Sequence, residues 1–331
     1  MGYFFEELTT ALRDYVRRET LLYFAQWLTY HYKNSKGEGP EIYLKREDPN
    51  HGSTYKINNA IAQAMIAKWM GWNSILAGTR AVQHEVVIAT TFVKLSLDCT
   101  IFMQSTDMEK QASNVLLMKH LRAEVESIDG TFKDGSSEAI RALMGNLETK
   151  YYLAEKTVGL HPCPSMGGRL DILVACIGSG SNALGLFHEF INDEDVRLIG
   201  VEAAGFELNN VGVYHGVMSY LLQDEEGQIL GPHSIGVGLK YPGVGPNVRF
   251  LKEIGRAEFH TTTSEEAVAT YRQLCQLEGI FQALEASHAL AFLEKLCPTL
   301  PNGTKVVVNL SSRRDKDATI VFQYQPDQLI D

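Results

Sequence analysis

Residues 170–187, LDILVACIGSGSNALGLF, run from an apolar stretch through a loop of small residues into a second apolar stretch. The first stretch, LDILVAC, has the length and composition of a buried strand, and the loop leads into a helix. Small residues let backbone N–H groups come close to an anion, and the start of a helix adds partial positive charge. The sequence therefore predicts a phosphate site formed by Gly178, Ser179, Gly180, Ser181 and Asn182. An ordinary tight turn between strand and helix explains the same residues, and the loop matches neither the P-loop nor the GxGxxG pattern.

Further strand-like runs occur along the chain, with amphipathic segments between them. These runs are NSILA (73–77), DCTIFM (98–103), AEVESI (123–128), VRLIGVE (196–202) and KVVVNL (305–310). Strands that alternate with helices form parallel sheets with helices on both faces, so the predicted fold class is α/β. Ligands bind such sheets at the carboxyl ends of the strands, which is where the small-residue loop lies.

Two segments carry clear helix signals. An apolar residue recurs at every fourth position from Ile57 to Trp69, and Gly71 suits a C-terminal cap. Thr263 and Glu266 have the spacing of a capping box before AVATYRQLCQLEG. We therefore expect one helix to begin near Lys56 and another directly after Thr263.

The composition argues against several classes of protein. The chain has 331 residues, 45% of them hydrophobic, so it can bury a core and is long enough for more than one domain. A formal net charge of -10 argues against nucleic acid or an anionic membrane as a partner, and no apolar run is long enough to span a bilayer. The five cysteines lack CxxC spacing, which is typical of reduced thiols in an intracellular protein. His51, His84 and His161 lack the spacing of metal ligands, so we expect no metal site.

Two residues gain meaning from the predicted phosphate loop. Lys56 stands where a loop turns into a helix, and Ser311 follows the strand-like run KVVVNL, where its hydroxyl could bond a ring nitrogen. Taken singly, Lys56 is an ordinary solvated lysine and Ser311 belongs to a charged loop. An amine, a phosphate site and a ring-nitrogen partner are together what pyridoxal phosphate requires. Glu285 stands at the start of a helix, where a first-turn acid is favoured by the helix dipole in any case.

The chain resembles the tryptophan synthase β chain, in its plant-type form, over nearly its whole length. The matching motifs follow one another in order: GPEIYLKREDPNHGSTYKINNAIAQA (39–64), LVACIGSGSNALGLFHEFIND (173–193), LIGVEAAGF (198–206), HSIGVGLKYPGVGP (233–246), RAEFHTTTSEEA (256–267), LEASHALAFLEKLCPTL (284–300) and VVVNLSSRRDKD (306–317). The resemblance implies the fold-type II architecture of pyridoxal phosphate enzymes, with the cofactor between two three-layer α/β domains. It also implies condensation of indole with L-serine, a homodimer, and an α chain that supplies indole.

The resemblance also assigns domains and roles. It implies an N-terminal domain of residues 1–21 and 55–160, a C-terminal domain of residues 22–54 and 168–331, and a linker at 161–167. Lys56 matches the catalytic Schiff-base lysine. The other cofactor-binding matches are the phosphate-loop residues Gly178, Gly180, Ser181 and Asn182, the ring-nitrogen partner Ser311 and the cofactor-facing acid Glu285. Thr79, Gln83 and His84 match the loop that holds the substrate carboxylate, and Lys133 with Asp134 falls in the family's mobile region.

The departures from the family concern chemistry. The family's carboxylate loop reads A-E-T-G-A-G-Q-H-G, whereas here it reads AGTRAVQHE, from Ala77 to Glu85. Gly78 replaces the catalytic acid, and a positioned acid–base group contributes roughly two to four powers of ten in rate. Val82 replaces a glycine that permits close backbone approach, and Glu85 would add negative charge beside a carboxylate site. Tyr55 replaces the histidine before the lysine.

Two main hypotheses follow for the function. The first is a tryptophan synthase β-like enzyme whose activity is reduced or lost. The second is an inactive paralogue that binds pyridoxal phosphate or pairs with normal subunits. Another fold-type II activity, such as cysteine synthase-like or dehydratase chemistry, is a third and weaker hypothesis. Plant-type β chains act in the plastid, but the N-terminal stretch lacks the build of a transit peptide, so we expect a cytoplasmic or plastid location.

Overall fold

The structure is a computed structural model of the chain, and it describes residues 2–79, 83–129, 132–146, 148–153, 170–204, 210–214, 217–232, 234–311 and 317–324. The chain forms two compact units. The first comprises Met1–Glu19 with Pro49–Thr157, and the second comprises Thr20–Asp48 with Val158–Asp331. Each unit is an α/β layer structure and is described by itself.

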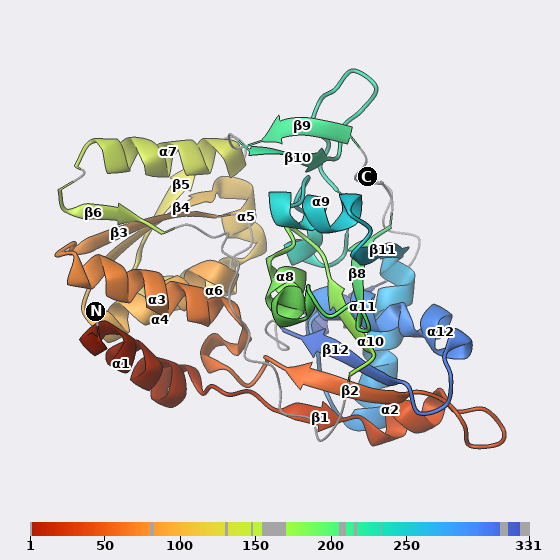
Figure 1. Cartoon of the computed structure of the whole chain (residues 1–331). Coiled ribbons are helices and arrows are strands. Elements are labelled where there is room, and N and C mark those ends of the chain that lie inside the picture. The colour runs from red at the N-terminus through yellow and green to blue at the C-terminus, as the bar shows by residue number, and fades with distance from the viewer. Residues whose placement is uncertain are drawn as a thin grey trace. The chain divides into compact units, whose positions relative to one another are not determined.

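The first unit is built on a four-stranded parallel sheet with the strand order β5-β4-β3-β6. Its strands are β3 (Ser74–Thr79), β4 (Asp98–Gln104), β5 (Glu124–Ile128) and β6 (Lys150–Tyr152). Its helices are α1 (Gly2–Thr10), η1 (Ala11–Val16), η2 (His51–Ser53), α3 (Lys56–Trp69), α4 (Gln83–Leu95), α5 (Ser105–Lys110), α6 (Ala112–His120) and α7 (Phe132–Met144). Figure 1 shows α7 on one face of the sheet and α3 with α4 on the other. The parallel ladder places the carboxyl ends of these strands at one edge.

Helix α3 shows how the predicted periodicity works. Ile57, Ile61 and Met65 are buried in the core of the first unit, as their spacing requires. Trp69, the last member of the series, is half exposed; its indole N–H donates to Glu7 Oε2 at 2.9 Å, and its ring meets Phe4 edge-on. The series therefore marks the buried face over three turns, and its last residue packs against α1.

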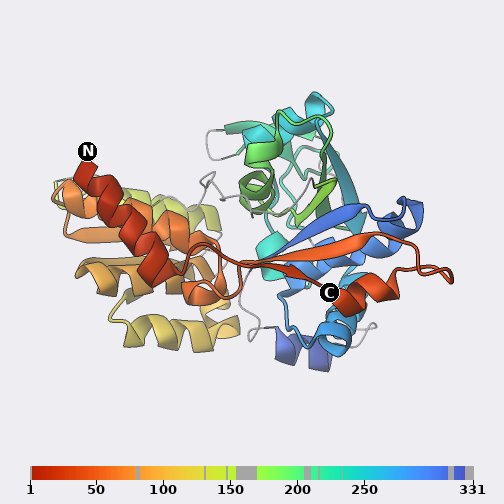
Figure 2. The ribbon, with the colours of Figure 1, turned by 60° about the horizontal axis from the view of Figure 1, so that its bottom comes forward.

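The second unit is built on a six-stranded sheet with the order β1-β2-β12-β7-β8-β11. All neighbours are parallel except β1 with β2. The strands are β1 (Leu22–Phe24), β2 (Glu41–Arg46), β7 (Ile172–Cys176), β8 (Arg197–Ala203), β11 (Ala257–Thr262) and β12 (Lys305–Leu310). Figure 2 shows β2 and β12 side by side although they are far apart in the sequence. A separate hairpin pairs β9 (Asn210–Tyr214) with β10 (Val217–Leu221).

Helices cover both faces of the larger sheet. They are α2 (Gln26–His31), α8 (Ser181–Phe187), η3 (His188–Phe190), η4 (Val237–Leu239), α9 (Pro246–Glu253), α10 (Ser264–Glu278), α11 (Leu284–Ala291), α12 (Leu293–Leu296), η5 (Cys297–Thr299) and α13 (Ala318–Gln323). Along β12, Val306 and Val308 join the core under α10 and α11, and Val307 joins the core under α8 and α9. Both faces of the strand are thus dry, as its continuous apolar sequence predicts. The predicted capping box is confirmed, because Thr263 Oγ1 and the Glu266 side chain bond each other's backbone N–H groups.

The boundaries between the two units lie a few residues from the predicted domain boundaries. Residues 20–21 belong to the second unit and residues 49–54 to the first, which reverses their predicted assignment. Thr20 is tied to the second unit because its hydroxyl donates to Glu47 Oε1 at 2.6 Å. Gly52 is tied to the first unit because it packs directly on Val87 of α4. The predicted linker, 161–167, lies outside the described residues. Within the described ranges, every helix is too short or too polar to cross a bilayer.

Candidate active site

The predicted phosphate loop lies between β7 and α8, and its packing requires two glycines. A Cβ on Gly178 would lie 2.3 Å from the carbonyl oxygen of Gly238, and a Cβ on Gly180 would lie 2.2 Å from Val248 Cγ2. Gly180 also has a φ of +101°, which L side chains rarely adopt. Gly245 N–H donates to the carbonyl of Ser179 at 2.9 Å. Gly238, Gly245 and Val248 therefore pack closely on the loop. The first N–H groups of α8 have no acceptor within their own helix.

Asn182, the second residue of α8, turns its side chain toward the sheet. Its Nδ2 donates to the carbonyl oxygen and lies within reach of Sγ of Cys176, both at 3.2 Å. Its Oδ1 accepts a hydrogen bond from Asn309 Nδ2 at 2.7 Å. The side-chain amide of Asn182 is thus engaged inside the unit, and what this residue offers an anion is its backbone N–H.

Glu285 and the phosphate loop meet at one glycine. Glu285 lies in the first turn of α11, is buried, and accepts a hydrogen bond from Gly238 N–H at 2.8 Å. A Cβ on Gly238 would lie 2.9 Å from that Oε1, and the carbonyl oxygen of the same residue touches Gly178. Gly236 is equally close to the Glu285 backbone, with a 3.2 Å contact from its ideal Cβ. Sequence reasoning missed these two glycines, although their alternation in SIGVGL was a signal.

Ser311 directly follows β12 and is buried. β12 runs parallel to β7, with Val308 opposite Val174, so Ser311 and the phosphate loop lie at the same edge of the sheet. Glu47 N–H donates to the carbonyl of Leu310 at 2.7 Å and fixes the chain just before the serine. The second unit therefore brings together the predicted loop, Glu285 and Ser311.

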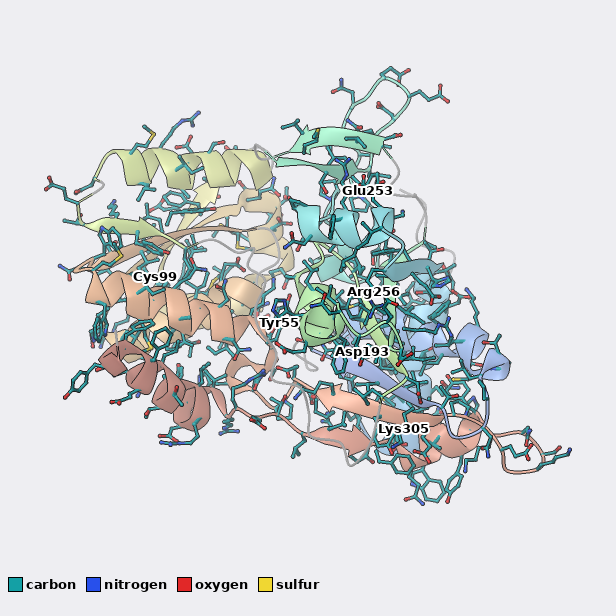
Figure 3. All side chains as sticks on the ribbon, viewed as in Figure 1. Tyr55, Cys99, Asp193, Glu253, Arg256 and Lys305 are labelled. Atoms are coloured by element: carbon teal, nitrogen blue, oxygen red, sulfur yellow. The ribbon has the colours of Figure 1, made fainter. Side chains whose placement is uncertain are left out.

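Lys56 is the first residue of α3 and belongs to the first unit. It is half-buried, and its backbone N–H donates to Thr54 Oγ1 at 3.3 Å. The turn before it requires glycine at position 52. Gly52 has a φ of +76°, and a Cβ there would lie 2.6 Å from Val87 Cγ2 of α4. Tyr55, labelled in Figure 3, precedes the lysine where the family has histidine. Lys56 thus stands at a fixed helix start, as the sequence predicted.

The substrate loop is described only at its two ends. Gly78 is buried in β3 opposite Phe102, and Thr79 ends that strand. Residues 80–82 and the side chains of Thr79, Gln83 and His84 lie outside the described part, as do those of Lys133 and Asp134, so their roles stay predictions.

Glu85 carries charge in an unusual place. It is fully buried in the first turn of α4. Burial, and secondarily the charge of Glu85, raises the pKa of the Cys99 thiol (Figure 3) above its ordinary value. The acidic side chain is thus buried near the core of the first unit, at a position where tryptophan synthase β chains have glycine.

His288 is a buried titratable residue beside Glu285. His288 is fully buried in α11, with Nδ1 2.8 Å from the carbonyl of Leu284, and burial lowers its pKa. Within the described ranges, no group of three His, Cys, Asp or Glu side chains could hold a metal ion.

The fold and the loop define the class of protein first: an α/β protein that binds a phosphorylated ligand at the carboxyl edge of a parallel sheet. Pyridoxal phosphate fits the residues present, because backbone N–H groups at the start of α8 suit its phosphate and the buried Ser311 hydroxyl suits its ring nitrogen. The model of the family described as "Pyridoxal-phosphate dependent enzyme" matches residues 26–312. The chain belongs to this family of pyridoxal-phosphate-dependent enzymes, and its cofactor is pyridoxal phosphate.

Solved structures support the same fold. An O-ureido-L-serine synthase is 17% identical, with a TM-score of 0.70 over 96% of this chain and 96% of that chain. Cysteine synthase from Entamoeba histolytica is 17% identical, with a TM-score of 0.69 over 93% of this chain and 89% of that chain. The predicted fold class, the α/β fold of fold-type II pyridoxal phosphate enzymes, is confirmed.

Proposed function

We propose that this protein is a tryptophan synthase β-like enzyme that condenses indole with L-serine, with activity reduced by changes in its substrate loop. Support comes from the second unit, where three motifs of the resemblance meet. The first forms β7 with the phosphate loop, the second forms α11 with Glu285, and the third forms β12 with Ser311. The observation that carries the proposal is Gly238, whose backbone touches the phosphate loop and Glu285 at once.

Each residue then has a defined task. The loop from Gly178 to Asn182 binds the phosphate through backbone N–H groups. The Ser311 hydroxyl would donate a hydrogen bond to the ring nitrogen, which would stay unprotonated and neutral. Lys56 is the amine that holds the cofactor covalently and moves protons at the substrate Cα. When bound, pyridoxal phosphate supplies an electron sink for a carbanion at that carbon.

Gly78 is the reason to expect weak turnover. It carries no acid where tryptophan synthase β chains have one. Loss of a positioned acid–base group costs roughly two to four powers of ten in rate. This residue equally favours the second candidate function, an inactive paralogue that still binds the cofactor. The homodimer and the α chain are further proposals, which size-exclusion chromatography with and without an α chain tests.

The first test is cofactor attachment. Pyridoxal phosphate added to the purified protein should give the visible absorbance band of a lysine-bound cofactor, and borohydride should fix the cofactor on the peptide that contains Lys56. Lys56→Ala should lose both signals, because no other amine takes its role. Lys68→Ala, on the same helix, is the matched control and should keep both. A band that survives in Lys56→Ala would refute the assignment.

The second test is turnover. Indole and L-serine are supplied to the loaded protein, and tryptophan is measured by chromatography. We expect slow formation in the wild type. Gly78→Glu alone should not restore normal turnover, because Val82 and the buried Glu85 still replace two glycines of the loop. Turnover near that of an ordinary β chain in the single variant would contradict this expectation. Cofactor binding without any tryptophan would favour the inactive paralogue.

A further inference from the structure

A chain of buried amides joins the two strand ends that form the cofactor site of the second unit. Asn309, in β12, is only 1% exposed, and its Nδ2 donates to Asn182 Oδ1 at 2.7 Å. Asn182 in turn donates from Nδ2 to the carbonyl of Cys176, the last residue of β7, at 3.2 Å. Asn309 Oδ1 is buried and has no hydrogen-bond partner among the described residues. Burying a polar amide costs more free energy than burying an apolar side chain of similar size, so we expect this amide to have a specific role.

The backbone explains why the amides are needed there. β12 pairs with β7 only from Val306 to Val308, where Val308 stands opposite Val174. Beyond that point β12 pairs with β2 alone, as far as Leu310 opposite Arg46. The ladder between the two strands has therefore ended before Ser311 and before the phosphate loop. At the level of the site, the hydrogen bond between Asn309 and Asn182 connects these two strand ends.

The side chain of Asn309 also points the right way. Val306, Val308 and Leu310 contribute to the core under α10 and α11, whereas Val307 contributes to the core under α8 and α9. Side chains alternate along a strand, so Asn309 shares the face of Val307, the face that α8 covers. The hydrogen bond to Asn182 in α8 agrees with this placement.

We propose that Asn309 is a positioning residue that sets the spacing between the phosphate loop and Ser311. The proposal rests on the cofactor, and not on the reaction with indole. Pyridoxal phosphate is a rigid ligand that is held at its phosphate and at its ring nitrogen. Binding at both ends adds affinity only where the phosphate loop and the Ser311 hydroxyl already lie at the right distance from each other. In this proposal Asn309 acts through Asn182 and through the strand that carries Ser311.

The test compares one whole ligand with its two parts. Asn309→Leu keeps the size of the side chain and removes the donor. Dissociation constants are measured by fluorescence titration for pyridoxal phosphate, for pyridoxal and for inorganic phosphate. We expect the affinity for pyridoxal phosphate to fall roughly tenfold, about the effect of one buried hydrogen bond. The affinities for pyridoxal and for inorganic phosphate should each change less than about twofold. Each of these ligands carries only one of the two groups, so its binding does not depend on the spacing between the loop and Ser311.

The control is Asn114→Leu, which removes another buried amide. Asn114 lies in α6 of the first unit, and its Nδ2 donates to Gln111 Oε1 at 2.9 Å. This variant should lose stability and keep all three affinities. Asn309→Ala should repeat the result of Asn309→Leu without adding bulk.

Three results would overturn the proposal. One is unchanged affinity for pyridoxal phosphate in both Asn309 variants. Another is a parallel loss for all three ligands, which marks a collapsed site and not a changed spacing. The third is failure of both variants to fold while Asn114→Leu folds, which would make Asn309 a residue of general stability. Tryptophan formation bears on none of these results, so failure of the proposed reaction stays distinguishable.

Discussion

Gly178 and Gly180 show at the scale of single residues how a phosphate loop is specified. The sequence presents them as small residues in a turn, and that pattern predicts the loop. It does not say which neighbour each glycine touches, because Gly238 lies 60 residues after Gly178 and Val248 lies 68 residues after Gly180. Asn309 is a similar case: it sits in an apolar run, and only the folded sheet shows its bond to Asn182.

Gly180→Ala tests the loop. An added Cβ would meet Val248 Cγ2 and would also have to adopt the φ of +101°. We expect a loss of about 1–2 kcal/mol from the backbone conformation and about 1–3 kcal/mol from the overlap, together with weaker cofactor binding. Urea unfolding and cofactor titration measure the two effects.

Gly37→Ala provides the matched control for that variant. Gly37 has a φ of +77°, but nothing lies within 4 Å of its ideal Cβ. It should lose only the conformational part, about 1–2 kcal/mol, and should bind the cofactor normally. Equal losses in the two variants would show that the contact with Val248 is unimportant.

His288 gives the chain a residue-scale dependence on pH. Burial lowers its pKa from 6.5, and the hydrogen bond to the Leu284 carbonyl, followed by the charges of Glu285 and Glu266, opposes this only in part. As the pH falls below about 6.5, the unfolded chain takes up the proton first, so the free energy of unfolding decreases and levels off below the folded-state pKa. His288→Leu should reduce the difference between unfolding midpoints at about pH 8 and about pH 5.5. An unchanged difference would mean that other groups set the acid limit.

At the scale of elements, every strand-like run that the sequence predicted is a strand, whereas β2 was missed. The six predicted strand runs all appear, as β3, β4, β5, β7, β8 and β12. β2 was missed because its sequence EIYLKR ends in two charged residues, one of which, Lys45, is almost fully buried. The hairpin β9–β10 was missed because its region lacks periodicity. Burial of a charge depends on a partner elsewhere in the chain, which spacing alone does not reveal.

The partner of Lys45 is Glu47, and together they test the end of β2. The ammonium lies 3.4 Å from Glu47 Oε1 and bonds the Thr20 carbonyl at 2.8 Å, with both charged side chains buried. Glu47→Gln removes a buried negative charge beside the lysine ammonium, so we expect a loss of about 3–5 kcal/mol in urea unfolding.

An exposed ion pair in the same sheet is the control for Glu47→Gln. Arg197 on β8 pairs with Glu258 on β11 at 2.8 Å, and both side chains are about two-fifths exposed. Glu258→Gln should cost about 0–1 kcal/mol, because water screens the pair. Adding Lys45→Met to Glu47→Gln should recover part of the loss, since it removes the uncompensated charge. No recovery would point to lost packing and not to lost charge compensation.

At the scale of the whole molecule, the chain builds two units with separate hydrophobic cores. One core belongs to the first unit, and the larger sheet of the second unit has a core on each face. The sequence predicted two α/β domains but misplaced the crossings by up to six residues, because the contacts of Thr20 and Gly52 depend on folded neighbours. Lys56 belongs to the first unit and the predicted phosphate loop to the second.

The three tryptophans make this division measurable. Trp27 lies in the second unit, whereas Trp69 and Trp72 lie in the first. In Trp27→Phe the fluorescence reports on the first unit alone, and in the double variant Trp69→Phe, Trp72→Phe it reports on the second alone. Separate cores need not unfold together, so each reporter has its own urea midpoint to follow.

Pyridoxal phosphate should raise both midpoints in a protein that keeps Lys56. A ligand at one hundred times its dissociation constant stabilises the state that binds it by about 2.7 kcal/mol, and a ligand held by residues of both units stabilises both. In the Lys56→Ala background the second-unit reporter should still rise, because the phosphate loop is intact, whereas the first-unit reporter should stay where it is without cofactor. A first-unit reporter that ignores the cofactor when Lys56 is present, or follows it equally when Lys56 is absent, would contradict the proposed attachment.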